Sequence, residues 1–235
     1  SAHGVSPAVH EEAAARSLKI IDATCPLVTK VHHEVRRFAN DETEILLIGH
    51  EGHEEVEGTA GEAVGKVRIV DGLEGARTVE PTPGKKLVWL SQTTLSVDDT
   101  KSIINILKSR FPNIKVPKND DICYATQNRQ DAVKQLALES DYMIVVGSVN
   151  SSNSNRLKEL AEKCGCKAVL IDEFDELNLD DLEGCKTISI TAGASAPEAR
   201  VQEIANALKE YTGANINENG EDKESIFFKL PPLLR

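Results

Sequence analysis

The chain alternates between short aliphatic runs and longer amphipathic stretches, with polar loops between them. Six apolar-rich runs predict β-strands, at residues 19–23, 44–48, 87–90, 142–146, 168–171 and 187–190. Six stretches with helical spacing of apolar positions predict α-helices, at residues 28–40, 54–61, 97–110, 129–139, 156–164 and 197–211. A last apolar stretch, residues 226–230, predicts a strand that returns to the body of the protein.

This repetition of strand, loop and helix is typical of parallel βαβ units and predicts an α/β fold. In parallel sheets, ligands bind beyond the carboxyl ends of the strands. The polar loops of this chain follow the strands at those ends, so we expect the chemistry to gather on one face. The polar stretch 111–121, which contains two prolines, predicts a domain boundary.

Composition narrows the choice of function. Aromatic residues make up only 4% of the 235 residues, so the core must be aliphatic. The formal net charge of −11 argues against nucleic-acid binding, which needs a basic surface. It does not exclude a small anionic ligand held by backbone N–H groups. No run approaches the roughly 18 apolar residues of a membrane-spanning helix.

The five cysteines are an odd number and are scattered along the chain, which favours a reducing, cytosol-like compartment with free thiols. Cys25 and Cys123 lie in polar surroundings at predicted loop starts, where thiolates make good iron or zinc ligands. Both are also small enough to be plain core residues. The other three, Cys164, Cys166 and Cys185, precede strands and are expected to be structural.

Two loops have the composition of anion sites. The loop Gly-Ser-Val-Asn-Ser-Ser-Asn-Ser-Asn-Arg at residues 147–156 opens a helix, and Ser151, Ser152 and Asn153 are its central donors. The loop at residues 191–197 repeats the design with Ser195 before a proline. Each loop taken alone can also be an ordinary helix cap. Two in equivalent places favour a diphosphate site.

Histidines are concentrated on two other loops. His3 lies near the amino end, and His50 and His53 lie in Gly-His-Glu-Gly-His, with Glu55 close behind. Such a cluster at a strand end can bind phosphate or metal, or supply a proton. The spacing of His50 and His53 differs from the i, i+4 histidine pair of zinc proteases.

Taken together, these loops resemble the signature segments of the 4-hydroxy-3-methylbut-2-enyl diphosphate reductase family. The resemblance runs through the whole chain in order, at residues 1–7, 21–32, 47–58, 91–100, 121–130, 145–156 and 191–197. The loop at 147–156 is its most distinctive part. The resemblance implies a trefoil of three α/β domains with parallel sheets around a central [4Fe–4S] cluster. It also implies reductive dehydroxylation of the substrate to isopentenyl and dimethylallyl diphosphate.

Matched residue by residue, the resemblance makes Cys25 and Cys123 cluster ligands and Glu55 the proton donor, with Thr93 assisting near the leaving hydroxyl. The residues that it assigns to the substrate are His3, His53, Thr93, Ser151, Ser152, Asn153 and Ser195. Reduced ferredoxin or flavodoxin is the implied electron donor. The implied location is cytoplasmic, or the plastid stroma in a photosynthetic eukaryote.

The match also predicts a missing part. The family's first cluster cysteine belongs to a segment that would precede Ser1, so we expect this chain to lack the third cysteine ligand. Expected domains are the tail of a first α/β domain at 1–26, a second at 27–118, a third at 119–212 and a returning segment at 213–235. Two other functions stay open: a phosphate-binding α/β module without redox activity, and a zinc hydrolase that uses His50, His53 and Glu55.

Overall fold

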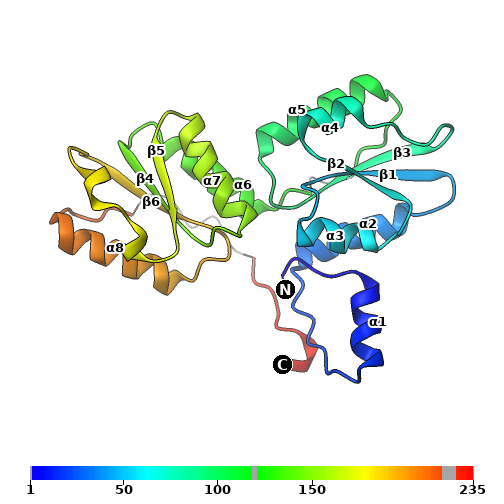
Figure 1. The fold of residues 1–235 in the computed structure, drawn as a ribbon, viewed down its shortest axis with the longest axis horizontal. Coiled ribbons are helices and arrows are strands. Elements are labelled where there is room, and N and C mark those ends of the chain that lie inside the picture. The colour runs from blue at the N-terminus through cyan, green and yellow to red at the C-terminus, as the bar shows by residue number, and fades with distance from the viewer. Residues whose placement is uncertain (1, 118–120, 219–225, 235) are drawn as a thin grey trace. The chain divides into compact units, whose positions relative to one another are not determined.

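The computed structural model describes residues 2–117, 121–218 and 226–234 (Figure 1). The chain divides into two compact units. The first comprises Ser1–Cys123 together with Ile226–Arg235, and the second comprises Tyr124–Ser225. The domain boundary predicted between residues 118 and 119 lies outside the described residues. None of the described helices is long and apolar enough to cross a membrane.

The first unit is built around a parallel sheet. Its elements are α1 (Pro7–Ala15), α2 (Pro26–Phe38), β1 (Thr43–Ile48), α3 (Glu54–Gly61), β2 (Val67–Val70), α4 (Gly72–Thr78), β3 (Lys86–Ser91) and α5 (Val97–Arg110). The strand order is β2-β1-β3, with Ile48 in register with Val70 and Ser91. All carboxyl ends therefore lie at one edge of this sheet.

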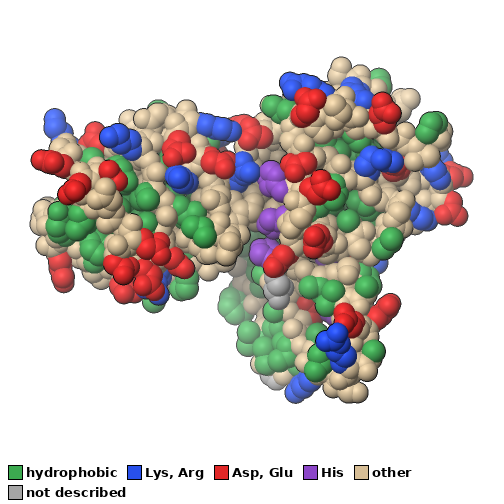
Figure 2. All heavy atoms as spheres, viewed as in Figure 1, with side chains coloured by type: hydrophobic (Ala, Val, Ile, Leu, Met, Phe, Trp, Pro, Cys, Tyr) green, Lys and Arg blue, Asp and Glu red, His purple; other side chains and the backbone are tan. Residues whose placement is uncertain are grey.

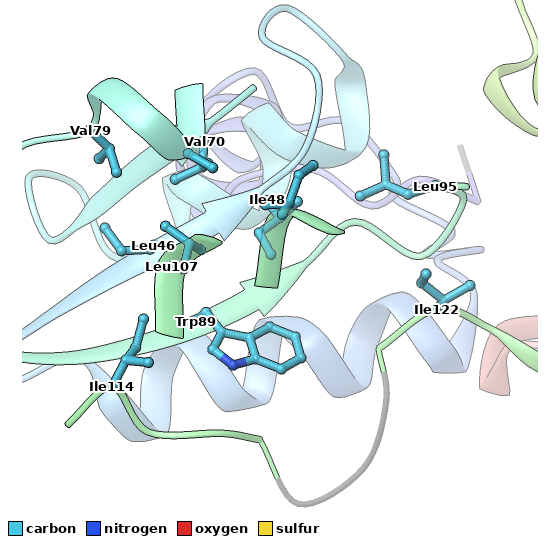
Figure 3. Packing of buried hydrophobic residues seen from close by; sticks show 11 residues of the cluster. Leu46, Ile48, Val70, Val79, Trp89, Leu95, Leu107, Ile114 and Ile122 are labelled. Carbon is cyan, nitrogen blue, oxygen red and sulfur yellow. The ribbon is translucent and has the colours of Figure 1, made fainter. Parts of the chain in front are cut away.

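Helices cover both faces of that sheet, because β1 buries all six of its residues and needs an apolar layer on each side. Leu46 and Trp89 pack with Leu107 of α5 on one face, as Figure 3 shows. On the other face, Ile45 and Leu47 pack with residues of α2 and α3, among them Val31, Val35 and Val56.

The second unit repeats this plan. Its elements are α6 (Tyr124–Leu136), β4 (Tyr142–Val146), α7 (Ser152–Lys163), β5 (Lys167–Ile171), the 3-10 turns Phe174–Glu176 and Leu179–Leu182, β6 (Ile188–Ala192) and α8 (Glu198–Thr212). The strands are parallel in the order β5-β4-β6. Ile144 packs towards α8 through Ile204, whereas Met143 and Val145 pack against Val133 of α6 and Leu157 of α7.

The two parallel sheets confirm the predicted α/β fold. Two predicted strands were wrong. Residues 19–23 and 226–230 have no strand structure, and Ile21 and Phe227 are 45% and 88% exposed. Neither segment therefore gains the buried, paired environment that makes an apolar run a strand. Helices α1 and α4 and strand β2 were not predicted from the sequence, although Pro7 at the start of α1 and its alanine-rich run favour a helix. β2 has only four residues, and Arg68 interrupts its apolar run.

Candidate functional site

Three loops meet at the carboxyl edge of the first sheet. One follows β1 and leads through His53 into α3, the next follows β3 and contains Thr93, and the third contains Asp121 and Cys123. A backbone hydrogen bond joins the last two, in which the N–H of Cys123 donates to the carbonyl oxygen of Thr93 at 3.1 Å. Parallel pairing of β1 and β3 brings their following loops together, as the sequence pattern implied.

Glu55 lies in the first turn of α3 and is 1% exposed. Its Oε1 accepts a hydrogen bond from the backbone N–H of Thr93 at 2.6 Å. Its Oε2 is buried and has no hydrogen-bond partner within the described part of the chain. Burial raises the pKa of Glu55 above its ordinary value, and the hydrogen bonds from Thr93 only partly oppose that effect. This environment favours a neutral carboxyl group.

His53 caps the same helix. Its Nδ1 accepts a hydrogen bond from the backbone N–H of Glu55 at 3.1 Å, so the neutral ring carries its proton on Nε2. Burial, reinforced by the nearby His3 and His50, lowers the pKa of His53. His53 is therefore a neutral ring that presents an Nε2–H donor.

The other loop histidines lie close by. The rings of His3 and His53 meet edge to face, with centroids 5.3 Å apart, and Nδ1 of His3 lies 3.1 Å from Oε2 of Glu54. Nδ1 of His50 lies 3.0 Å from Oδ1 of Asp71. Figure 2 shows histidine side chains gathered on one side of the first unit.

Asp121 is a second buried carboxyl group at this edge, and its side chain is 0% exposed. Its Oδ1 lies 3.2 Å from Nζ of Lys30, and its Oδ2 accepts the backbone N–H of Ser91 at 3.0 Å. Burial raises the pKa of Asp121 to about 6, although the contacts with Ser91 and Lys30 act in the opposite direction. Sequence reasoning missed Asp121 and Lys30, because 91 residues separate the two partners.

Cys25 and Cys123 form no disulfide in the described structure and lie in partly buried positions. Cys25 is the N-cap of α2, and its N–H donates to the carbonyl oxygen of Ala2 at 3.0 Å. Cys123 directly precedes α6. Cysteine side chains are common ligands of iron and zinc, so each thiol suits a metal ligand in chemical type. The described residues contain no group of three His, Cys, Asp or Glu side chains arranged to hold a metal ion.

The lack of such a group among the described residues has different consequences for an iron–sulfur cluster and for a zinc ion. A [4Fe–4S] cluster is held by cysteine thiolates, so the two thiols fit part of such a set in chemical type. A catalytic zinc ion needs three protein ligands in one place. His50 and His53 form no such trio with Glu55 among the described residues.

Cys166 differs from these two thiols, because it is 4% exposed and packs in the core of the second unit, where burial raises its pKa.

The second unit carries the polar loops. Ser151 is the N-cap of α7, and its Oγ accepts the N–H of Ser154 at 3.3 Å, while Ser152 is the first residue of the helix. Asn153 is 4% exposed, yet neither Nδ2 nor Oδ1 has a hydrogen-bond partner within the described residues. Burying an amide without hydrogen-bond partners costs about 1–3 kcal/mol of stability, so a ligand that hydrogen-bonded to Asn153 would recover this loss.

Ser154 brings the two polar loops of this unit together. A Cβ added to Gly147 would lie 2.3 Å from Oγ of Ser154, and one added to Gly193 would lie 2.1 Å from the same atom. Any larger residue at either position would clash with Ser154, so both positions require glycine. Ser195 is exposed two residues after Gly193. Sequence reasoning missed Ser154 as the contact between the loops, although it recognised both loops.

The sequence is similar to those of known proteins along its whole length. Residues 1–209 match the family model described as LytB protein. The 4-hydroxy-3-methylbut-2-enyl diphosphate reductase of Nocardia farcinica is 56% identical over 236 residues, covering 100% of this chain and 70% of the relative. The protein of the same name from Saccharophagus degradans is 53% identical over 239 residues, covering 100% of this chain and 77% of the relative.

The fold agrees with a solved relative. The structure of the E-1-hydroxy-2-methyl-but-2-enyl-4-diphosphate reductase from Plasmodium falciparum matches with a TM-score of 0.92 at 38% identity, covering 98% of this chain and 73% of that chain. Sequence and fold thus lead to one assignment over nearly the whole chain, which belongs to the LytB protein family.

Proposed function

We propose that this protein is a 4-hydroxy-3-methylbut-2-enyl diphosphate reductase, an iron–sulfur oxidoreductase of the non-mevalonate isoprenoid pathway. The observation that carries the proposal is identity of 56% along the full length of this chain to a relative of that name. In the reaction, the allylic C–O bond breaks, two electrons and two protons enter, and water leaves. The products are isopentenyl and dimethylallyl diphosphate.

Glu55 is proposed to donate the proton that converts the departing hydroxide to water. Since Oε1 accepts the N–H of Thr93, the acidic proton of a neutral Glu55 belongs on Oε2, the oxygen that has no partner among the described residues. A proton held there is available to an oxygen atom of the substrate. Thr93 contributes twice in this proposal, because its backbone orients the carboxyl group and its hydroxyl assists at the leaving group.

The diphosphate group is proposed to bind neutral donors. In the second unit these are Ser151, Ser152 and Asn153 at the start of α7, with Ser195 from the neighbouring loop. Asn153 supports this assignment most strongly, because its buried amide lacks a partner in the described residues. A helix amino terminus adds a favourable electrostatic field for an anion.

The first unit is proposed to add two histidine donors to the diphosphate, His3 and His53. The Nε2–H tautomer of His53 supports its part, because that N–H can donate to a phosphate oxygen.

Cys25 and Cys123 are proposed to hold two irons of a [4Fe–4S] cluster. When bound, the cluster supplies the electrons and a Lewis-acidic iron for the substrate's hydroxyl oxygen. Reduced ferredoxin or flavodoxin is proposed as the electron donor. A reducing compartment such as the cytosol is proposed as the location of the protein, because none of the five cysteines forms a disulfide in the described structure.

The test is turnover by the protein expressed from its complete coding frame, after anaerobic reconstitution with iron and sulfide. With a chemical one-electron reductant, we expect 4-hydroxy-3-methylbut-2-enyl diphosphate to be converted to the two products named above. Tight binding of the substrate with an intact cluster and no product would contradict the proposal and would favour a binding module without redox activity.

A further inference from the structure

Asp121 joins two segments that are far apart in the sequence. Lys30 of α2 contacts its Oδ1 at 3.2 Å, and the N–H of Ser91 at the end of β3 donates to its Oδ2 at 3.0 Å. The Asp121 side chain is 0% exposed, and the Lys30 side chain is 30% exposed. Both carboxylate oxygens are therefore occupied by groups of the first unit.

Each of the joined segments carries a residue with a proposed role. Lys30 lies on the helix that Cys25 caps, and Ser91 precedes Thr93 by two positions. Asp121 precedes Cys123 by two positions, and the N–H of Cys123 donates to the carbonyl oxygen of Thr93 at 3.1 Å. One carboxylate thus connects the segments of Cys25, Thr93 and Cys123.

A carboxylate is buried here next to the apolar core. Ile122, the next residue, packs in that core, whereas the Asp121 side chain is buried against the polar groups of Lys30 and Ser91. A buried ion pair contributes little net stability, because the loss of hydration offsets the attraction between the charges. A buried ion pair does constrain geometry, because a buried charged group has to stay beside its partners.

We propose that Asp121 is a positioning residue that fixes the spacing between the thiols of Cys25 and Cys123 and their placement beside Thr93. It touches neither substrate nor cluster in this proposal and acts through the segments that it joins. The importance of that spacing rests on the proposed function. The spacing itself is set by the protein alone, so it can be measured without a cluster or a substrate.

Glu44 provides a matched control. It is a buried carboxylate of the same unit, with Oε1 2.7 Å from Nε of Arg68 and Oε2 accepting the N–H of Thr82 at 2.6 Å. Like Asp121, it binds one cationic side chain and one backbone N–H. It lies at the amino end of β1, however, at the opposite edge of the sheet from Asp121.

The experiment measures cross-linking of the metal-free protein with a graded series of rigid bis-maleimides. Peptide mass spectrometry follows the product that joins Cys25 to Cys123, and urea unfolding is measured in parallel. The second, ring-closing step reports the effective concentration of one thiol at the other. The variants are Asp121→Asn and Glu44→Gln.

Both variants are expected to lower the urea midpoint by similar amounts. Only Asp121→Asn is expected to slow ring closure, by about tenfold with the best-matched linker, and to broaden the range of linkers that close. Unchanged closure in Asp121→Asn, or an equal change in Glu44→Gln, would overturn the proposal. If Asp121→Asn does not fold, Lys30→Met must show the same slowing, and normal closure there would overturn it equally. A failure to reduce the substrate would contradict the proposed function and leave these cross-linking rates unaffected.

Discussion

The carboxyl edges of the two sheets use the same scaffold for different chemistry. Both sheets place their first strand in the centre, in the orders β2-β1-β3 and β5-β4-β6, and both lead from that strand through a polar loop into a helix. At the edge of the first unit, the buried groups Glu55 and Asp121 are titratable. At the edge of the second, the buried groups Asn153 and Ser154 are neutral. Burial thus favours the protonated form of the Glu55 carboxyl group in the first unit. In the second unit it encloses neutral hydrogen-bonding groups.

The largest expected effect comes from removing the proton in the first unit. Glu55→Gln keeps the shape and the acceptor for Thr93 but cannot donate an acidic proton. We expect kcat to fall by about 10²–10⁴-fold with little change in KM, measured by steady-state turnover of the reconstituted protein.

Glu57→Gln is the matched control, because Glu57 is an exposed carboxylate on the same helix. It should turn over at the parent rate. Near-normal kcat in Glu55→Gln would remove Glu55 from the mechanism.

The second-largest expected effect comes from removing an uncharged hydrogen-bond donor, the buried amide of Asn153 in the second unit. Asn153→Leu removes the buried amide, so KM should rise by about 10–100-fold, which corresponds to about 1.4–2.8 kcal/mol of lost binding. The same change should raise the free energy of unfolding by about 1 kcal/mol, because an unsatisfied amide no longer has to be buried. Substrate kinetics test the rise in KM, and urea unfolding tests the rise in the free energy of unfolding. A variant that lost stability and kept its KM would show that Asn153 serves the fold alone.

The third effect is the pH dependence of the first unit. Burial raises the pKa of Glu55, so its acidic form persists to a higher pH than that of an exposed glutamate. Since the acidic form is the active one, kcat should be constant below this raised pKa and fall about tenfold per pH unit above it. A pH profile of kcat tests the sign, and a kcat that increased with pH through this range would oppose it.

The last expected effect is on stability alone and comes from a packing change in the second unit. In Gly193→Ala the new Cβ would lie 2.1 Å from Oγ of Ser154, so we expect a loss of about 1–3 kcal/mol in the free energy of unfolding. In a Ser154→Ala background the nearest remaining atom of that residue is Cβ at 3.4 Å, so the loss should largely disappear. A double-mutant cycle measures the difference, and additive losses would contradict the contact.

Local patterns predicted much of this fold. β4 was predicted with its observed bounds, because five consecutive buried residues between polar loops leave little choice. The helices α3 and α5 were also predicted with the right bounds, and Ser96 caps α5 by accepting the N–H of Asp99 at 3.2 Å. Residues 19–23 were predicted wrongly, because apolar content alone cannot tell a paired strand from an exposed segment.

The candidate site was predictable only in its residue types. Loops at strand ends identified Glu55, Thr93 and Asn153 as polar groups in the right places, but their burial depends on long-range packing. The pairing of Lys30 with Asp121 has no local signal at all, since it spans 91 positions. Patterns along the chain thus reveal which groups are present, whereas the sheet decides which of them become buried partners.

The most direct test of the contrast between the two edges is the protonation state of Glu55. Infrared difference spectra of the parent protein minus Glu55→Gln, recorded over a range of pH, isolate the signal of that one side chain. We expect the carbonyl stretch of the neutral carboxylic acid to persist to a higher pH than that of an exposed glutamate, such as Glu57 measured with Glu57→Gln, because burial raises the pKa of Glu55. Conversion to carboxylate bands at the same pH as the exposed glutamate, or below it, would contradict a raised pKa at Glu55.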